Sequence, residues 1–377
     1  MNILINTSNI RALGGVQVAD SICRELYKYT KHNFLVVLCE QLCNIEDDIN
    51  KYDNVTTVKY QCPINPKIVL WGRDKYLDSL VEENGIEAVL TVFGPSRWRP
   101  RVPHLSGMAI PHIVLTDSPY FKIIPGANNL YSHFRYRMMK WSFGHSSDAL
   151  FTENEYISQK LRKLFPKKEV FTVTNNYNQV FDEPERWDRT INLPPFDGIT
   201  LLTVASASLH KNHKIVIPTI EYINRKYPGF KYRFVFTISP DSLGEIGEEQ
   251  RKHIVFLGKV GIEQCPHLYE QADVMLLPSL LECFSASYAE AMKMRVPILT
   301  TDLGFAHSLC GEAALYYSAT APEALGDAIY TLANNNSLRK TLAEKGETQL
   351  KKFDTFEERA RRLIELTEKI AIKQQMK

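Results

Sequence analysis

The sequence predicts an α/β protein of two doubly wound, Rossmann-like domains, and three observations carry that prediction. The chain has 377 residues, which at about 150 residues per domain corresponds to two domains. Short apolar runs without polar alternation recur along it, as in strands that are buried on both faces of a parallel sheet. Helix-period segments separate these runs, and this alternation is typical of doubly wound sheets.

Two series of short apolar runs mark the expected strands. The first series comprises Ile3–Thr7, Phe34–Cys39, Ala88–Phe93, Ile113–Thr116, Ala149–Thr152 and Val170–Thr174. The second series comprises Thr200–Ala205, Arg233–Ile238, Ile254–Leu257, Val274–Leu277, Ile298–Thr301 and Ala314–Tyr317. Helical periodicity is clearest at Val16–Tyr29, Lys214–Lys226 and Ala286–Met294. Leu338–Lys377 carries no strand signal, so we expect helices there.

A charged, proline-bearing stretch separates the two series. It covers 183–189 and is followed by Pro194 and Pro195, a composition typical of an interdomain linker. The expected boundaries are a first domain at 1–185, a linker at 186–197, a second domain at 198–355 and a terminal helix at 356–377. Open α/β sheets bind ligands beyond the carboxyl ends of their strands, so two facing sheets would place a ligand in a cleft between the domains.

The composition is typical of a soluble protein of a reducing compartment. Lys and Arg total 45 against 43 Asp and Glu, a net charge of +2, so global charge gives no case for nucleic-acid binding. The seven cysteines form no C-x-x-C pair, which argues against a disulfide framework and against a thiolate zinc site. No signal-peptide pattern and no apolar run of membrane-spanning length occurs, so we expect a cytoplasmic protein.

Two turns that follow the first strand of each series are candidate phosphate sites. Adjacent glycines such as Gly14 and Gly15 let backbone amides approach a phosphate or sugar at a helix N-terminus, although a plain strand–helix turn is an alternative. Their spacing does not fit G-x-G-x-x-G, so a dinucleotide fingerprint is not supported. Lys211 lies just past Thr200–Ala205, where it is either a partner for a diphosphate or a solvated surface lysine.

The most informative segment is Pro278–Met292. Glu282 precedes the expected helix and Glu290 lies inside it, with seven residues between them, so both carboxylates are expected at one ligand site. The free amides around Cys283–Ser285 would point at an anion bound there. The alternative is structural, because Ser287 and Glu290 also fit an S/T-x-x-E capping box.

These residues resemble the signature of retaining glycosyltransferase family 4, also called glycosyl transferases group 1. The resemblance rests on Ala272–Ser279, the pair Glu282 and Glu290, Glu290-Ala291-Met292, Val296-Pro297-Ile298, Phe256–Val260, Cys310–Tyr316, the His210-Lys211-Asn212 turn and the Gly14-Gly15 pair. The clear match covers about residues 199–335, and the first domain matches mainly in layout and in the glycine pair.

The resemblance implies a GT-B fold with the active site between an N-terminal acceptor domain and a C-terminal nucleotide-sugar domain. The terminal helix would cross back to the first domain, as it often does in the family. The implied reaction moves a sugar from a nucleotide-diphosphate sugar to a hydroxyl of a glycan or a lipid-linked saccharide, in surface polysaccharide or glycolipid synthesis. A sugar-nucleotide epimerase or hydrolase of GT-B fold and a non-catalytic nucleotide-sugar-binding protein are the alternatives.

The family also implies a role for each matching residue. The catalytic residues would be Glu282, which contacts hydroxyls of the donor sugar, and Lys211, which balances the diphosphate charge. Glu290 would hold the ribose hydroxyls. The remaining donor-binding residues would be Gly14 and Gly15 at the diphosphate, Ser206 beside Lys211, the amides of Phe284 and Ser285 near the phosphate, and the backbone of Gly258 and Val260 at the base.

Several positions depart from the family pattern. Ser206 stands where the family usually has an arginine, so one phosphate cation is missing, and Cys283-Phe284-Ser285 replaces Gly-Phe-Gly. A histidine usually found on the acceptor side is replaced near Thr116, where Asp117 is either the acceptor-side group or a helix cap. No Asp-x-Asp occurs, so we expect no metal and no other cofactor.

One region is strongly basic. Seven basic residues and one acid lie between Arg97 and Lys140, and Leu130–Trp141 combines aromatic and apolar residues with this charge at near-helical spacing. Such a helix suits an anionic membrane surface, which would make the protein peripheral at the inner face of the membrane. A helix whose apolar side faces the core and whose basic side is solvated is the alternative.

Overall fold

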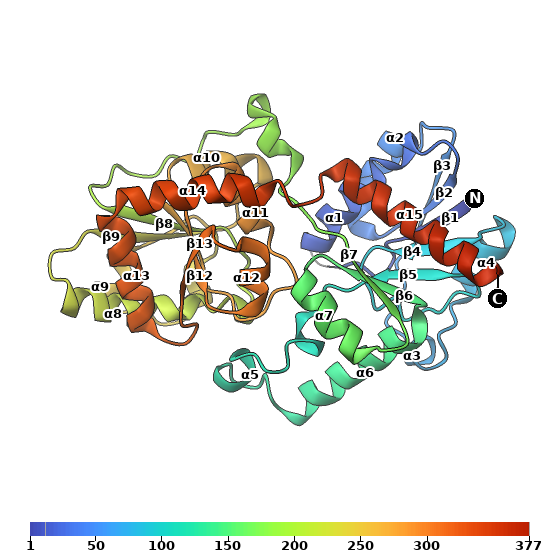
Figure 1. Ribbon diagram of the computed structural model, residues 1–377, viewed down its shortest axis with the longest axis horizontal. Coiled ribbons are helices and arrows are strands. Elements are labelled where there is room, and N and C mark those ends of the chain that lie inside the picture. Colours follow the sequence, from blue (N-terminus) through green and yellow to red (C-terminus); the bar gives the residue numbers. More distant parts are fainter. Residues whose placement is uncertain (12, 377) are drawn as a thin grey trace. The chain divides into compact units, whose positions relative to one another are not determined.

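The computed structural model of the chain describes residues 1–11 and 13–376 (Figure 1). The contacts within it divide the chain into two compact units. The first unit contains Met1–Leu115, Asn129–Asn175 and Asp354–Lys377, and the second contains Thr116–Asn128 and Asn176–Phe353. Each unit is built around one parallel sheet.

The sheet of the first unit has seven strands in the order β3-β2-β1-β4-β5-β6-β7, all parallel. The strands are β1 (Asn2–Asn6), β2 (Asn33–Leu38), β3 (Val55–Lys59), β4 (Ala88–Thr91), β5 (His104–Gly107), β6 (Ala149–Thr152) and β7 (Glu169–Thr172). In register, Ile3 of the interior strand β1 pairs with Phe34 on one side and with Ala88 on the other. The neighbours of β1 are buried from Phe34 onward in β2 and along the whole of β4, which explains their largely apolar sequences.

Helices surround this sheet. They are α1 (Leu13–Cys23), α2 (Glu46–Ile49), α3 (Pro66–Trp71), α4 (Lys75–Glu83), α6 (Leu130–Ser146), α7 (Glu155–Leu164) and α15 (Phe356–Gln375). The last of these, α15, begins with a capping box between Thr355 and Glu358 and lies against β4 and β5 (Figure 1). Leu363, Ile364 and Ile370 of α15 are buried in the core of the first unit, so the end of the chain is part of that core.

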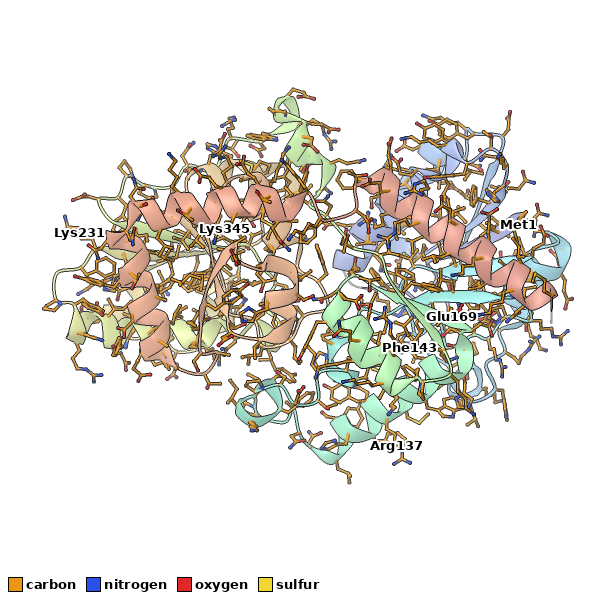
Figure 2. All side chains as sticks on the ribbon, in the orientation of Figure 1. Met1, Arg137, Phe143, Glu169, Lys231 and Lys345 are labelled. Atoms are coloured by element: carbon orange, nitrogen blue, oxygen red, sulfur yellow. The ribbon has the colours of Figure 1, made fainter. Side chains whose placement is uncertain are left out.

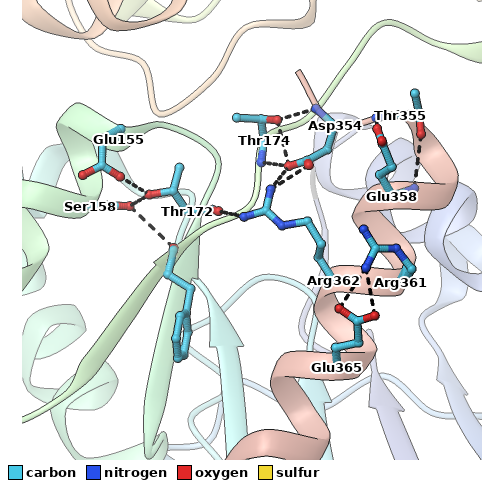
Figure 3. Close-up of polar contacts among 11 residues, drawn as sticks. Glu155, Ser158, Thr172, Thr174, Asp354, Thr355, Glu358, Arg361, Arg362 and Glu365 are labelled. Atoms are coloured by element: carbon cyan, nitrogen blue, oxygen red, sulfur yellow. Dashed lines mark hydrogen bonds and ion pairs between the residues drawn. The ribbon is translucent and has the colours of Figure 1, made fainter. Parts of the chain in front are cut away.

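Asp354 fastens the start of α15 to the strand β7. Its Oδ2 accepts hydrogen bonds from the amide of Thr174 at 2.7 Å and from its hydroxyl at 2.9 Å. Arg362, in the second turn of α15, donates to Asp354 Oδ1 at 2.6 Å and to the carbonyl oxygen of Thr172 at 2.6 Å (Figure 3). These polar contacts hold α15 in place beyond what its apolar face contributes.

The helix α6 is buried at one end and exposed at the other. Leu130, Tyr131 and Phe134 are 87%, 71% and 62% exposed, whereas Phe143 is fully buried. In Figure 2, Arg137 projects outward from α6, while Phe143 points into the body of the unit. The alternative of a core-facing apolar stripe is therefore wrong for the first turn of this helix.

The sheet of the second unit has six parallel strands in the order β10-β9-β8-β11-β12-β13. The strands are β8 (Ile199–Thr203), β9 (Tyr232–Phe236), β10 (Ile254–Phe256), β11 (Val274–Leu277), β12 (Ile298–Thr301) and β13 (Ala314–Tyr317). The helices are α5 (Tyr120–Ile123), α8 (Val216–Lys226), α9 (Glu248–Arg251), α10 (Cys265–Glu270), α11 (Ala286–Lys293), α12 (Gly304–Cys310), α13 (Pro322–Asn334) and α14 (Asn336–Leu350). The six expected strands of the second series coincide with these six.

In the first unit, one expected strand is wrong and two strands were not expected. Ile113–Thr116 is apolar because Ile113 is buried in the 3-10 turn Pro111–Ile113, not because it joins a sheet. The strand β5 contains a buried histidine and a buried serine, and the partly exposed strand β3 contains two threonines and a lysine. Neither sequence therefore shows a continuous apolar run. The expected helix Val16–Tyr29 ends at Cys23 and is followed by a short 3-10 turn at Leu26–Lys28.

The segment predicted as a linker, 186–197, lies against the second unit. The amide of Asp188 donates to the carbonyl oxygen of Glu263 at 2.9 Å, and the amide of Leu193 donates to Gln271 Oε1 at 2.7 Å. Gln271 in turn donates to the carbonyl oxygen of Ile191 at 2.9 Å. These bonds tie the segment to α10 and its flanks.

Candidate functional site

The candidate site lies at the carboxyl ends of β8 and β11, which are neighbours in the sheet of the second unit. The loops after the two strands are joined, because the amide of Leu280 donates to the carbonyl oxygen of His210 at 2.8 Å. The hydroxyl of Ser287 on α11 donates to the carbonyl oxygen of Val204 at the end of β8, also at 2.8 Å. The structure thus brings the two most informative sequence segments together, at the edge where parallel sheets bind ligands.

Lys211 and Glu282 form a buried ion pair at this edge. The Lys211 Nζ lies 2.5 Å from Glu282 Oε1, and the two side chains are 11% and 7% exposed. Lys211 ends a 3-10 turn at Leu209–Lys211, and Asn212 after it has a left-handed backbone with φ of 53°. The alternative of a solvated surface lysine is wrong, because Lys211 is buried and paired.

Glu290 is buried on α11, and its carboxylate has a different partner. Tyr269 of α10, itself fully buried, donates a hydrogen bond from its hydroxyl to Glu290 Oε2 at 2.9 Å. Burial raises the pKa of Glu290 to about 7, and the Tyr269 hydrogen bond and the Lys211 charge act in the opposite direction. Lys211, Glu282 and Glu290 therefore form one cluster of interacting charges.

The capping-box alternative for Ser287 and Glu290 is wrong. The N-cap of α11 is Ser285, and Ser287 donates its hydroxyl to Val204 instead of capping the helix. Ser285 makes no side-chain cap hydrogen bond either. Among the residues that the structure describes, the amides of Phe284, Ser285 and Ala286 donate to no protein acceptor. Such amides at a helix start are available to an anion.

The remaining expected donor-side residues lie on the same unit. Gly258 and Val260 follow β10, two strands away from β8, and Gly258 has φ of 71°, a conformation that glycine adopts without strain. Val260 is half-buried. Ser206 is exposed after β8, and its hydroxyl lies 2.9 Å from that of Ser208. The structure does not show a ligand role for any of these three.

Gly14, Gly15 and Asp117 lie outside this cluster. The two glycines are in the first turn of α1 in the first unit. A Cβ at Gly14 would meet nothing within 4 Å, while one at Gly15 would lie 3.2 Å from Ile10 Cγ2. Asp117 is exposed in the segment Thr116–Asn128 of the second unit. Their contribution to a ligand site stays a prediction.

Two further residues of the site were not found from the sequence. Tyr269 precedes Glu290 by 21 residues, and nothing in the sequence joins them. The ring Nε2 of His213 lies 2.8 Å from the carbonyl oxygen of Ser206 and steadies the loop after β8. Burial lowers the pKa of His213 to about 4, so this ring is neutral at pH 7. The only feature of the sequence that could have indicated His213 is its position two residues after Lys211.

Within residues 1–11 and 13–376, no group of three or more His, Cys, Asp or Glu side chains is arranged to hold a metal ion. In the same residues, no helix is both long enough and apolar enough to cross a bilayer.

Comparison with known proteins finds a family match within the unit that carries this cluster. Residues 198–335 match the family model described as glycosyl transferases group 1. A stretch of 103 residues is 30% identical to an uncharacterized glycosyltransferase of Methanocaldococcus jannaschii, and it covers 27% of this chain and 29% of that relative. The chain thus spans less than a third of the length of the curated relative that it matches.

Solved structures extend the likeness to the whole chain. A glycosyltransferase from Rickettsia africae has a TM-score of 0.69 at 14% identity, with 98% of each chain covered. Sucrose-phosphate synthase from Thermosynechococcus elongatus has a TM-score of 0.70 at 14% identity, again with 98% of each chain covered. The Anabaena protein HepE, in complex with UDP and glucose, has a TM-score of 0.63 at 11% identity, covering 97% of this chain and 98% of that one. These likenesses confirm the expected fold.

Proposed function

We propose that the chain, which has the GT-B fold, is a retaining, metal-independent glycosyltransferase of the glycosyl transferases group 1 family, whose model residues 198–335 match. It would move a sugar from a nucleotide-diphosphate sugar to a hydroxyl of a glycan or lipid-linked saccharide. The observation that supports this most strongly is the buried cluster of Lys211, Glu282 and Glu290 beside the free amides that precede α11.

The charge of the leaving group explains the need for Lys211. Breaking the bond between a sugar and a diphosphate leaves negative charge on the diphosphate, and preorganised cations and amide dipoles lower the barrier most. Lys211 and the amides of Phe284 and Ser285 would receive that charge, in place of a metal ion. Lys211 would exchange part of its interaction with Glu282 for the diphosphate as the bond breaks.

The two carboxylates would recognise the donor by its hydroxyls. A buried carboxylate accepts two neighbouring hydroxyls well, because no water competes for its lone pairs. Glu290 would take the ribose diol, and Glu282 the hydroxyls of the transferred sugar. The HepE structure contains UDP and glucose, so UDP-sugars are the first donors to test.

The acceptor side of the proposal rests on α6. Its first turn presents exposed Leu130, Tyr131 and Phe134, and Arg135 and Arg137 beside them are also exposed. An exposed apolar and basic helix end suits an anionic membrane, in which the side chains enter the headgroup region and the cations meet lipid phosphates. We therefore propose a lipid-linked saccharide acceptor and a peripheral location at the inner face of the membrane.

The activity test is donor turnover in the presence of a chelator. Wild-type protein with EDTA and UDP-sugars is expected to release UDP slowly, and to form a glycoside of unchanged anomeric configuration when an acceptor glycan is added. UDP release that no acceptor accelerates would indicate the hydrolase or epimerase alternative. Donor binding without any turnover would indicate a non-catalytic binding protein. Activity that EDTA abolishes and manganese restores would contradict metal independence.

The membrane test is flotation with liposomes of neutral or anionic lipid. Wild type is expected to float only with anionic liposomes, and less as salt increases. The variant Leu130→Ser/Phe134→Ser should remain in solution, whereas Ile372→Ser, which removes an exposed apolar side chain from α15, should float as wild type does. Equal flotation of both variants, or flotation independent of anionic lipid, would contradict the proposal.

A further inference from the structure

Arg97 of the first unit is held in an unusual state. Its backbone lies in the left-handed region with φ of 61°, which costs energy for any residue with a Cβ. Its guanidinium Nη1 is buried without a hydrogen-bond partner. Among the described residues, Arg97 also forms no ion pair, and burial lowers its pKa. A strained backbone thus holds a half-buried cation that forms no ion pair with a carboxylate of the described residues.

Arg97 and a second arginine both lie in loops at the carboxyl edge of the first sheet. Arg97 follows β4 and Arg11 follows the neighbouring strand β1. Arg11 donates from Nη2 to the carbonyl oxygen of Cys62 at 2.6 Å. The charge of Arg11 lowers the pKa of Arg97 further, and both charges lower the pKa of the Cys62 thiol.

The carboxylate beside Cys62 has other partners. Asp74 Oδ2 accepts the hydroxyl of Tyr60 at 2.7 Å, and its Oδ1 accepts the amides of Tyr76 and Leu77 as the N-cap of α4. Among the described residues, Asp74 forms no ion pair with either arginine. Other polar atoms at the same edge are also buried without partners, among them Asn9 Oδ1, which follows β1. Unsatisfied buried polar groups in a native protein require a reason, and a ligand is one.

We propose that Arg97 and Arg11 form a subsite for an oxyanion group, a phosphate or a carboxylate, of the acceptor saccharide. Two guanidinium groups offer planar pairs of N–H donors that match both groups, and an anion between them would remove their mutual repulsion. That the anion belongs to the acceptor rests on the proposed transferase function. The subsite itself is defined by the residues of the first unit alone.

Thermal unfolding with inorganic phosphate and with matched sugars tests the subsite. Wild type is expected to gain unfolding temperature with phosphate, and with glucose 6-phosphate or glucuronate but not with glucose. The two charged sugars separate a phosphate preference from a carboxylate preference. Arg97→Asn should bind the anion at least tenfold more weakly while its unfolding temperature is kept or raised, because asparagine tolerates the left-handed backbone. Arg99→Asn, an exposed neighbour, is the matched control and should bind as wild type does.

Phosphate bound at the donor cluster is distinguished by a second variant. In Lys211→Met/Glu282→Gln the anion response is expected to persist, because the subsite does not use those residues. An anion response lost in that variant and kept in Arg97→Asn would overturn the subsite. So would a wild type that no oxyanion stabilises, or an Arg97→Asn protein that is destabilised yet binds normally. If the protein is not a transferase, phosphate should still stabilise wild type and should still bind Arg97→Asn more weakly, because the subsite does not depend on that activity.

Discussion

The hydroxyl of Tyr269 donates a 2.9 Å hydrogen bond to Oε2 of Glu290, and both side chains are buried. This contact leaves the other carboxylate oxygen of Glu290 with no protein partner among the described residues. A buried carboxylate that one tyrosine orients, and that Lys211 influences, is well suited to accept the hydroxyls of a ligand. Tyr269 is therefore a positioning residue in the proposed donor site.

Removing this hydroxyl should weaken donor binding without disturbing the fold. In Tyr269→Phe, one hydrogen bond to a charged group is lost, so we expect about tenfold weaker binding of a UDP-sugar at pH 7. The pKa of Glu290 should rise further, so part of the affinity should return at higher pH. Titration calorimetry at two pH values measures both effects.

Tyr288 supplies the matched control for that variant. It is equally buried, but its hydroxyl lies 2.8 Å from the hydroxyl of Thr300, away from Glu290. Tyr288→Phe should bind donor as wild type does. Equal losses in both variants would mean that the Tyr269 effect is only structural.

The affinity for donor should depend on pH through Glu290. Its pKa is raised to about 7, and the ionised form is the one that accepts two hydroxyls. Affinity should therefore increase as pH rises from 6 to 8, and Glu290→Gln should bind weakly with a flat profile. The direction for stability is opposite, because the folded protein holds this proton more tightly than the unfolded chain does. Glu290 should destabilise the protein as pH rises from about 4.5 through 7. A wild-type affinity that falls with rising pH would contradict this role.

The second unit was almost fully predictable from the sequence, and the first was not. The strand β11 is buried along its whole length and all four of its residues are apolar, so the sequence shows it as an apolar run. The strand β5 is equally buried, but His104 is satisfied there by Thr91 and Ser146, which hides the strand from any apolar pattern. A local hydrophobicity pattern therefore identifies a buried strand only where the buried residues are apolar.

The same limit applies to the candidate site. Lys211, Glu282 and Glu290 were identified because they belong to a motif, and their pairing then follows from adjacent strands. Tyr269 is brought to Glu290 only by the packing of α10 on α11, which no local spacing encodes. Arg97 is distinguished by its backbone angle and by the partners that it lacks, and neither can be read from a sequence.

Lys211 should be needed for the reaction more than for the fold. In Lys211→Met, kcat should fall by about 10² to 10³, the usual effect of losing one preorganised charge-stabilising group. The fold should lose about 3 kcal/mol as well, because Glu282 is left buried and unpaired. The rate of UDP release measures the loss of kcat, and chemical denaturation measures the loss of unfolding free energy.

The double variant separates these two effects. Lys211→Met/Glu282→Gln removes both charges, so most of the lost stability should return while activity stays low. An active double variant would contradict the proposed catalytic role of Lys211. A double variant as unstable as the single one would contradict the buried ion pair as the source of the instability.

Asp354 should be a strong contributor to the stability of the first unit. Asp354→Ala removes the hydrogen bonds from Thr174 and leaves Arg362 without its carboxylate, so we expect a loss of about 3 kcal/mol in unfolding free energy. Glu365→Ala is the control, because Glu365 makes an exposed pair with Arg361 one turn away in α15 (Figure 3) and should cost below about 0.5 kcal/mol. Urea denaturation measures both losses of unfolding free energy. Equal losses in Asp354→Ala and Glu365→Ala would show that Asp354 does not hold α15 in place.

The most direct test of the donor site is a thermal-shift measurement without metal. Wild type and Glu290→Ala are compared with uridine-, guanosine-, adenosine- and cytidine-diphosphate sugars. We predict that one nucleotide class raises the unfolding temperature of wild type and that this rise is lost in Glu290→Ala. No rise with any donor, or the same rise in both proteins, would contradict the assignment of this cluster as the nucleotide-sugar site.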